Sequence, residues 1–208
     1  MSKPSGYTIT LLRVGDTSWD EENRLVGTTD LPMTNLGADA VARAVHDGEF
    51  DQPFSIVLVS DEEAAVSASR MLPRTSDTKV KTVPELANVG LGLWEGVLWS
   101  DLEDRNPNCY TQLRDHPERI TPPEGESLHD AQDRLLDAIQ KSLAKVKGSN
   151  PQVAIVLRPL AWAVVRSWLE NDNLSSLWDQ LEQPASIERF QITKSQLENH
   201  KQSSKANA

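Results

Sequence analysis

Four short runs of apolar and β-branched residues divide the chain and limit the folds that it can adopt. Each run has the length and composition of a β-strand. The runs are YTITLL at 7–12, SIVLVS at 55–60, VAIVL at 153–157 and IERFQI at 187–192. Apolar residues at helical spacing lie between these runs, over 35–46, 62–72, 128–147 and 160–168. Strands that alternate with helices predict an α/β fold, a three-layer αβα sandwich with a mostly parallel central sheet.

The length of the chain fits one domain with a full core. Its 208 residues would be few for two complete domains. We expect one domain over 1–193 and a polar, flexible tail over 194–208, where apolar residues become rare. The segment 84–127 has four prolines among 107–123, and we expect it to be an irregular excursion across the C-terminal ends of the strands. In such sheets these strand ends form the binding sites.

Charge and composition exclude several classes of function. The net charge of −10 and the lack of a strong basic cluster disfavour nucleic acid as a partner. No apolar run approaches the roughly 20 residues of a membrane span, and the N-terminus lacks the apolar core of a secretory signal. The single cysteine, Cys109, allows no intrachain disulfide, so a cytoplasmic location is expected. No cluster of His, Cys or carboxylate residues has metal-site spacing, and we expect neither a metal nor another cofactor.

Several motifs follow one another in a recognisable order. They are RVGDTSWD at 13–20, NRLVGTTDLPMTNLG at 23–37, LANVGLGLWEGVLWSDL at 86–102, PPEGESLHDAQDRL at 122–135 and VAIVLRPLAWAVVRSWL at 153–169. In order and spacing this chain resembles the histidine phosphatase superfamily, in its phosphoglycerate mutase-like branch, over about residues 7–192. The family motifs are R-H-G-E-T-x-W-N, G-R-x-x-G-x-x-D-x-P-L-T-x-x-G, L-x-E-x-x-x-G-x-W-E-G, P-P-G-G-E-S-x-x-D-x-x-x-R and a strand that ends in S-H-G. The resemblance implies a phosphoglycerate mutase-like fold.

The resemblance also implies a set of catalytic positions. In that family the His of R-H-G attacks phosphorus, a second His, two arginines and an Asn hold the phosphoryl oxygens, and a Glu protonates the leaving oxygen. By motif, Val14 takes the place of the attacking His, Arg158 that of the second His and Asn88 that of the Glu. Asp20 replaces the Asn, and Ala64 replaces the second Arg in the family's S-P-L-x-R-A. The first Arg is retained as Arg13.

These replacements predict a catalytically inactive member, a pseudophosphatase with a binding or regulatory role. Val14 has no lone pair with which to attack phosphorus, and Asn88 cannot donate a proton as a carboxylic acid would. The alternative is a weakly active or chemically altered phosphatase or mutase that acts on a small phosphorylated or anionic substrate. There Arg13 and Arg158 would hold the anion, and Asp16 or Asp20 would act as the base. Whether the chain is an enzyme stays open.

The candidate ligand-binding residues each have two interpretations. They are Arg13, Asp20, Arg24, Glu126, Ser127 and Arg158. Arg13 either binds an anion or pairs with Asp16 or Asp20. Arg158 either keeps positive charge in an anion-binding pocket or plugs that pocket through an ion pair with Asp20.

The remaining candidates are equally open. Glu126 and Ser127 either line the rim of the site, or Ser127 only caps the long helix. Arg24 either contacts the ligand or covers the pocket. Trp99 and Trp162 either pack in the core or form an aromatic surface for a protein partner. The expected partners are therefore a small anion or phosphorylated ligand, and a protein.

Overall fold

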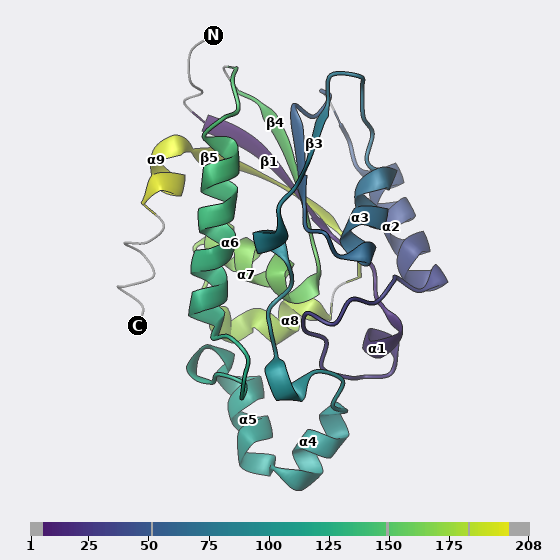
Figure 1. Ribbon diagram of the computed structural model, residues 1–208, viewed down its shortest axis with the longest axis vertical. Helices are drawn as coiled ribbons and strands as arrows, with labels where there is room; N and C mark the ends of the chain where they lie inside the picture. Colours follow the sequence, from purple (N-terminus) through teal and green to yellow (C-terminus); the bar gives the residue numbers. More distant parts are fainter. Residues whose placement is uncertain (1–5, 51, 149, 183, 200–208) are drawn as a thin grey trace.

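The computed structural model describes residues 6–50, 52–148, 150–182 and 184–199 (Figure 1). Its strands are β1 (Gly6–Arg13), β2 (Ile56–Val59), β3 (Lys79–Thr82), β4 (Gln152–Leu157) and β5 (Ile187–Thr193). Its α-helices are α1 (Ser18–Glu21), α2 (Asn35–Asp47), α3 (Glu63–Met71), α4 (Trp99–Arg105), α5 (Pro107–Asp115), α6 (Leu128–Leu143), α7 (Pro159–Glu170), α8 (Leu177–Leu181) and α9 (Lys194–Glu198). Short 3-10 helices cover Pro84–Leu86, Gly92–Trp94, Pro117–Arg119 and Leu174–Ser176.

The strands form one sheet in the order β3-β2-β4-β1-β5. β1, β2, β3 and β4 run parallel to one another, and β5 pairs antiparallel with β1. The predicted mostly parallel sheet is confirmed. Only β3 lacked a predicted strand, because its sequence KVKT alternates lysines with small residues and lies at an exposed edge.

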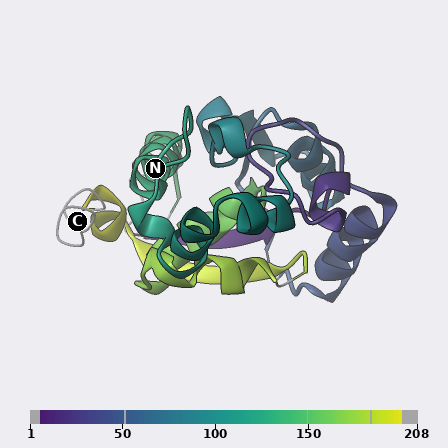
Figure 2. The same cartoon turned by 90° about the horizontal axis from the view of Figure 1, so that it is seen from below.

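Helices cover both faces of the sheet and complete the predicted three layers (Figures 1 and 2). Successive side chains of a strand point to opposite faces. Accordingly, Ile9 and Leu11 of β1 pack in one core with α6 and α7, whereas Leu12 packs in a second core with α2 and α3. The same alternation assigns Val14, the residue after β1, to the core beneath α2 and α3.

Local capping explains where two of the predicted helices begin. The side chain of Thr34 accepts a hydrogen bond from the backbone N–H of Gly37 at the start of α2. Ser127 does the same for Asp130 at the start of α6. Both are the hydroxyl caps that helix N-termini favour.

The segment 84–127 is more regular than expected. It contains α4 and α5, which Figure 1 shows at the bottom of the molecule, beyond the helices that flank the sheet. Pro107, which suggested irregular structure, is the first residue of α5. Proline fits this position because the N–H that it lacks would have no partner inside the helix.

The expected flexible tail also begins with a helix. Lys194–Glu198 form α9, which Thr193 caps, and Leu197 is buried against the core that includes α6 and α7. The expectation of a loose tail was therefore wrong for this part, and residues 200–208 lie outside the described chain. In the described residues, no helix has the length and apolar character needed to cross a membrane.

Candidate functional site

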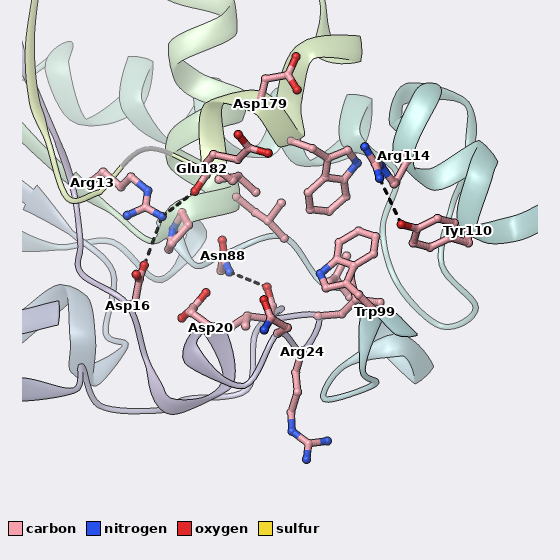
Figure 3. A pocket seen from close by; sticks show the side chains of 18 residues that line it. Arg13, Asp16, Asp20, Arg24, Asn88, Trp99, Tyr110, Arg114, Asp179 and Glu182 are labelled. Carbon is pink, nitrogen blue, oxygen red and sulfur yellow. Dashed lines mark hydrogen bonds and ion pairs between the residues drawn. The ribbon is translucent and has the colours of Figure 1, made fainter. Parts of the chain in front are cut away.

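A cavity of about 510 Å³ lies beyond the C-terminal end of β1 (Figure 3). Its lining comes from the chain around α1, the start of α7 and the helices α4, α5 and α8. The charged side chains that line it are Arg13, Asp16, Asp20, Arg24, Arg114, Asp179 and Glu182. Within the described ranges, no three His, Cys, Asp or Glu residues are grouped so that they could hold a metal ion.

Arg13 ends β1 and enters the cavity wall with its charge already paired. Its Nη2 donates to Oδ1 of Asp16 at 3.3 Å and to the carbonyl of Leu181 at 3.2 Å. Burial lowers the pKa of Arg13 and raises that of Asp16, while their mutual attraction opposes both changes. Of the two partners considered for an internal pair, Asp16 and not Asp20 is the one that it contacts.

Asp20 lines the cavity and also stabilises the first turn of α1. Its Oδ2 accepts hydrogen bonds from the backbone N–H and the hydroxyl of Thr17, each at 2.7 Å. This contact belongs to a capping box, in which the cap residue and the third helical residue satisfy each other. Asp20 thus brings a carboxyl group to the cavity.

Arg158 is fully buried, and its ion-pair partner is Glu62. Its Nη1 donates to Oε1 of Glu62 at 2.8 Å and to the carbonyl of Thr29 at 3.0 Å. The expected pair between Arg158 and Asp20 was wrong, and Arg158 is not part of the cavity lining. Its Nε and Nη2 have no hydrogen-bond partner among the described residues. Only Nη1 of the Arg158 guanidinium therefore forms hydrogen bonds with the described residues.

Sequence reasoning missed Glu62, although strand pairing explains its position. β2 and β4 are adjacent and parallel, with Val59 opposite Val156. Glu62 and Arg158 follow these two residues at the same edge of the sheet. A carboxylate and an arginine after neighbouring parallel strands are the signal that could have identified the pair, once the strand order was known.

Both the nitrogen and the oxygen of the Asn88 side-chain amide form hydrogen bonds. Its Nδ2 donates to the carbonyls of Gly27 and Val26 at 3.0 and 3.2 Å, and its Oδ1 accepts from the backbone N–H of Ala161 at 2.9 Å. Its own backbone N–H donates to Oε2 of Glu62. Although Asn88 lies at the cavity, it is 1% exposed and holds the start of α7 against the loop after α1.

Val14 is fully buried and lies outside the cavity lining. Its isopropyl group belongs to the apolar core beneath α2 and α3, which also contains Ala64. The next residue, Gly15, passes so close to Gly37 that a Cβ on Gly15 would lie 2.0 Å from the Gly37 carbonyl oxygen. The loop after β1 is therefore packed against the start of α2, with no space for a larger side chain at Gly15.

Arg24 lines the cavity, but its guanidinium contacts residues outside the cavity lining. Its Nε donates to Glu22 at 2.6 Å and its Nη1 to the carbonyl of Gly96 at 2.8 Å. Figure 3 shows its guanidinium pointing away from the other labelled side chains.

Glu126 and Ser127 stand apart from the cavity lining. Glu126 accepts hydrogen bonds from Arg134 and from the backbone N–H of Gly90, whereas Ser127 caps α6. Of the six candidate residues, the structure thus brings Arg13, Asp20 and Arg24 to one cavity and places Glu126, Ser127 and Arg158 elsewhere.

An aromatic wall closes the side of the cavity formed by α4, α5 and α8. The Trp99 ring meets those of Trp178 and Tyr110 edge to face, with centroids 4.8 and 6.1 Å apart. Nε1 of Trp178 donates to the carbonyl of Leu113 at 2.6 Å, which holds its ring in place. Trp162 is buried in the core instead. Core packing is thus confirmed for Trp162, and Trp99 packs against the same core while its aromatic partners come from α5 and α8.

Comparison with known proteins identifies the superfamily of the chain. The sequence model of the histidine phosphatase superfamily (branch 1) matches residues 9–204. The metal-independent phosphoserine phosphatase of Arabidopsis thaliana is 29% identical over 145 residues, which cover 68% of this chain and 60% of that protein. The probable phosphoglycerate mutase GpmB of Serratia proteamaculans is 27% identical over 143 residues, which cover 69% and 66%. The matches therefore span less than two thirds of each relative's length.

Solved structures share the fold at lower identity. YhfR of Bacillus stearothermophilus superposes with a TM-score of 0.70 at 23% identity, over 83% of this chain and 84% of its own. The mycobacterial glucosyl-3-phosphoglycerate phosphatase superposes with a TM-score of 0.72 at 20% identity, over 90% and 92%. The predicted phosphoglycerate mutase-like fold is confirmed.

Proposed function

Because the chain belongs to the histidine phosphatase superfamily (branch 1), we propose that it is a member without phosphohistidine chemistry, kept for binding or regulation. Val14 is the observation that carries this proposal. By its motif, Val14 stands where the family has its attacking histidine, and its side chain is fully buried in an apolar core. An alkyl group has no lone pair for a covalent intermediate, and here it does not reach the cavity.

The other positions that differ from the family motifs support the same proposal, because the side chain at each of them contributes to the packing or hydrogen bonding of the fold. Arg158 pairs with Glu62, and Ala64 packs in the core that contains Val14. Asn88 uses its amide on two carbonyls and one N–H group. Groups that act as one catalytic unit lose most of their effect when the nucleophile alone is missing.

The charge of the cavity also opposes a phosphoryl group. Asp16 and Asp20 lie on one side of the cavity, and Asp179 and Glu182 lie on the other (Figure 3). Two like charges about 4 Å apart repel by about 4 kcal/mol at an effective dielectric constant of 20. The lining holds these four carboxylates against three arginines, of which Arg13 and Arg24 are already paired with carboxylates.

A turnover assay with a matched variant tests the proposal. The purified chain is incubated with p-nitrophenyl phosphate, phosphoserine and 3-phosphoglycerate, and free phosphate and acid-labile phosphate on the protein are measured. The Arg13→Met variant, purified in the same way, reports any contaminating phosphatase. We expect equal background rates and no phosphohistidine. Phosphate release at least tenfold faster in the unsubstituted chain than in the variant would overturn the proposal.

The alternative is a weak or altered phosphatase, and Asp16 is the observation that favours it. Burial raises the pKa of this carboxyl group, which would suit it to accept or donate a proton beside Arg13. Such an activity would depend on Asp16 or Asp20, so Asp16→Asn and Asp20→Asn should each remove it. Any Arg13-dependent rate that survives both substitutions would exclude this mechanism.

A further inference from the structure

The arginines at the cavity are already engaged. Arg13 is held by Asp16 and two carbonyls, and Arg24 is held by Glu22 and the Gly96 carbonyl. Arg114 lies over the Tyr110 ring, 5.8 Å from its centroid, and donates to the Tyr110 hydroxyl at 3.2 Å. Arg13 and Arg24 therefore already have carboxylate partners, whereas Arg114 has the ring and hydroxyl of Tyr110.

By contrast, the carboxylates of Asp179 and Glu182 are not engaged in such contacts. Asp179 belongs to α8 and Glu182 follows its last turn, and both are exposed. Neither side chain forms a hydrogen bond or ion pair with any residue that the structure describes. Asp20 adds a third carboxylate, whose Oδ1 has no hydrogen bond to the described chain. Figure 3 shows Asp179 and Glu182 above the cavity and Asp20 below them.

The aromatic wall lies to one side of these carboxylates. Figure 3 shows Trp99 and Tyr110 on one side of the cavity, with Asp20 opposite them and Glu182 and Asp179 above. The face of an aromatic ring attracts cations, and the position of Arg114 over Tyr110 shows that this wall already accepts one. Leu25, Leu91 and Leu160 add apolar side chains to the cavity lining.

Building on the proposed binding role, we propose that the cavity binds an organic cation, a protonated amine or quaternary ammonium carried on an apolar body. The cationic group lies among the carboxylates of Asp20, Asp179 and Glu182, and the apolar body lies against Trp99 and Trp178. The cavity of about 510 Å³ is within the size range of small-molecule sites. The net charge of −10 favours the approach of a cation through the field of the whole protein.

Three probes of similar size and different charge test this inference by calorimetric titration at low salt. They are phenethylamine, 2-phenylethanol and phenyl phosphate. We expect phenethylamine to bind most tightly and to weaken when salt is raised, because salt screens its attraction to the carboxylates. Binding of 2-phenylethanol or phenyl phosphate as tight as that of the amine would overturn the inference.

Substitutions of residues that line the cavity test where the amine binds. In the double variant Asp179→Asn and Glu182→Gln we expect about tenfold weaker binding, since two exposed charge contacts are lost. The matched control is Asp47→Asn with Glu49→Gln, an exposed acidic pair at the end of α2 and outside the cavity lining. Trp99→Leu should weaken binding about threefold, whereas Trp99→Phe retains a ring and most of the affinity. Equal affinity in the cavity variant and its control would overturn the inference.

The same samples separate this inference from the proposed function. Phosphate release from phenyl phosphate that depends on Arg13 would overturn the proposed function. No amine binding together with no turnover would overturn only the organic-cation inference. Thermal unfolding of every variant verifies that the substituted chains are folded.

Discussion

Arg158 and Glu62 form a buried ion pair, with Nη1 2.8 Å from Oε1, although 96 residues separate them in the chain. By its motif, Arg158 takes the place of the family's second histidine, and Glu62 precedes Ala64 by two residues in the chain. A buried guanidinium without a counter-charge would be strongly destabilising, so the carboxylate makes the arginine tolerable at this position.

The pair predicts strong coupling between its members. Arg158→Met and Glu62→Met should each lower the free energy of unfolding by about 3–5 kcal/mol, because each leaves an unpaired buried partner. Combining Arg158→Met with Glu62→Met should cost clearly less than the sum of the two single Met changes. Urea denaturation of the four chains measures this coupling. Additive losses would contradict the interaction, and the exposed pair of Lys194 with Glu198 provides a weakly coupled control.

Restoring the family's histidine should not restore its chemistry. Val14→His places an imidazole in a fully buried apolar position, which should cost about 1–3 kcal/mol through overpacking. We expect no acid-labile phosphate on this variant after incubation with p-nitrophenyl phosphate, because Arg158 and Asn88 remain engaged in the fold. Val14→Ala is the control for disturbed packing. Phosphohistidine on the Val14→His chain alone would mean that only the nucleophile was missing.

Asn88→Asp should be destabilised more at higher pH. The new carboxylate would face the carbonyls of Val26 and Gly27, which now accept from the amide, and we expect a loss of about 3 kcal/mol near pH 7. When protonated, the carboxyl can donate to one of these carbonyls. Its pKa is then higher in the folded than in the unfolded chain, so stability falls as pH rises.

Urea denaturation at pH 5 and pH 7.5 measures this trend for the carboxyl group that Asn88→Asp introduces. Asn88→Ala also loses the three contacts but adds no titratable group. The difference in the free energy of unfolding between Asn88→Ala and the unsubstituted chain should be the same at the two pH values. A parallel pH trend in both variants would contradict the assigned hydrogen bonds.

Glu95 should stabilise the protein only while it is ionised. Burial alone would raise its pKa, but hydrogen bonds from Thr29 and Thr28 lower it overall. The backbone N–H groups of these threonines lie 2.9 Å (Thr28) and 2.8 Å (Thr29) from its carboxylate oxygens. Glu95→Gln should therefore cost about 2 kcal/mol at neutral pH.

The difference in the free energy of unfolding between Glu95→Gln and the unsubstituted chain should become smaller as the pH falls. Since the folded pKa lies below the unfolded value, the stabilisation is present above the ordinary value of 4.5 and is lost as pH falls through the folded pKa. Chemical denaturation between pH 7 and pH 3 measures this, with the exposed Glu85→Gln as control. A difference that stays constant over this range would contradict a stabilising carboxylate.

Short-range patterns were sufficient for much of the fold. The apolar runs located four of the five strands, and Ser127 marked the start of α6. The ordered motifs identified the superfamily, because they preserve spacing along the chain. These features depend on residues a few positions apart, where backbone preference and side-chain periodicity act directly.

The site depended on which segments meet in space. The sheet order β3-β2-β4-β1-β5 places the ends of β2 and β4 side by side, which gives Arg158 the partner Glu62 in place of Asp20. The docking of α4, α5 and α8 builds the wall of Trp99, Tyr110 and Trp178. Neither arrangement follows from periodicity, because contacts between distant segments are set by strand pairing and core packing over the whole chain.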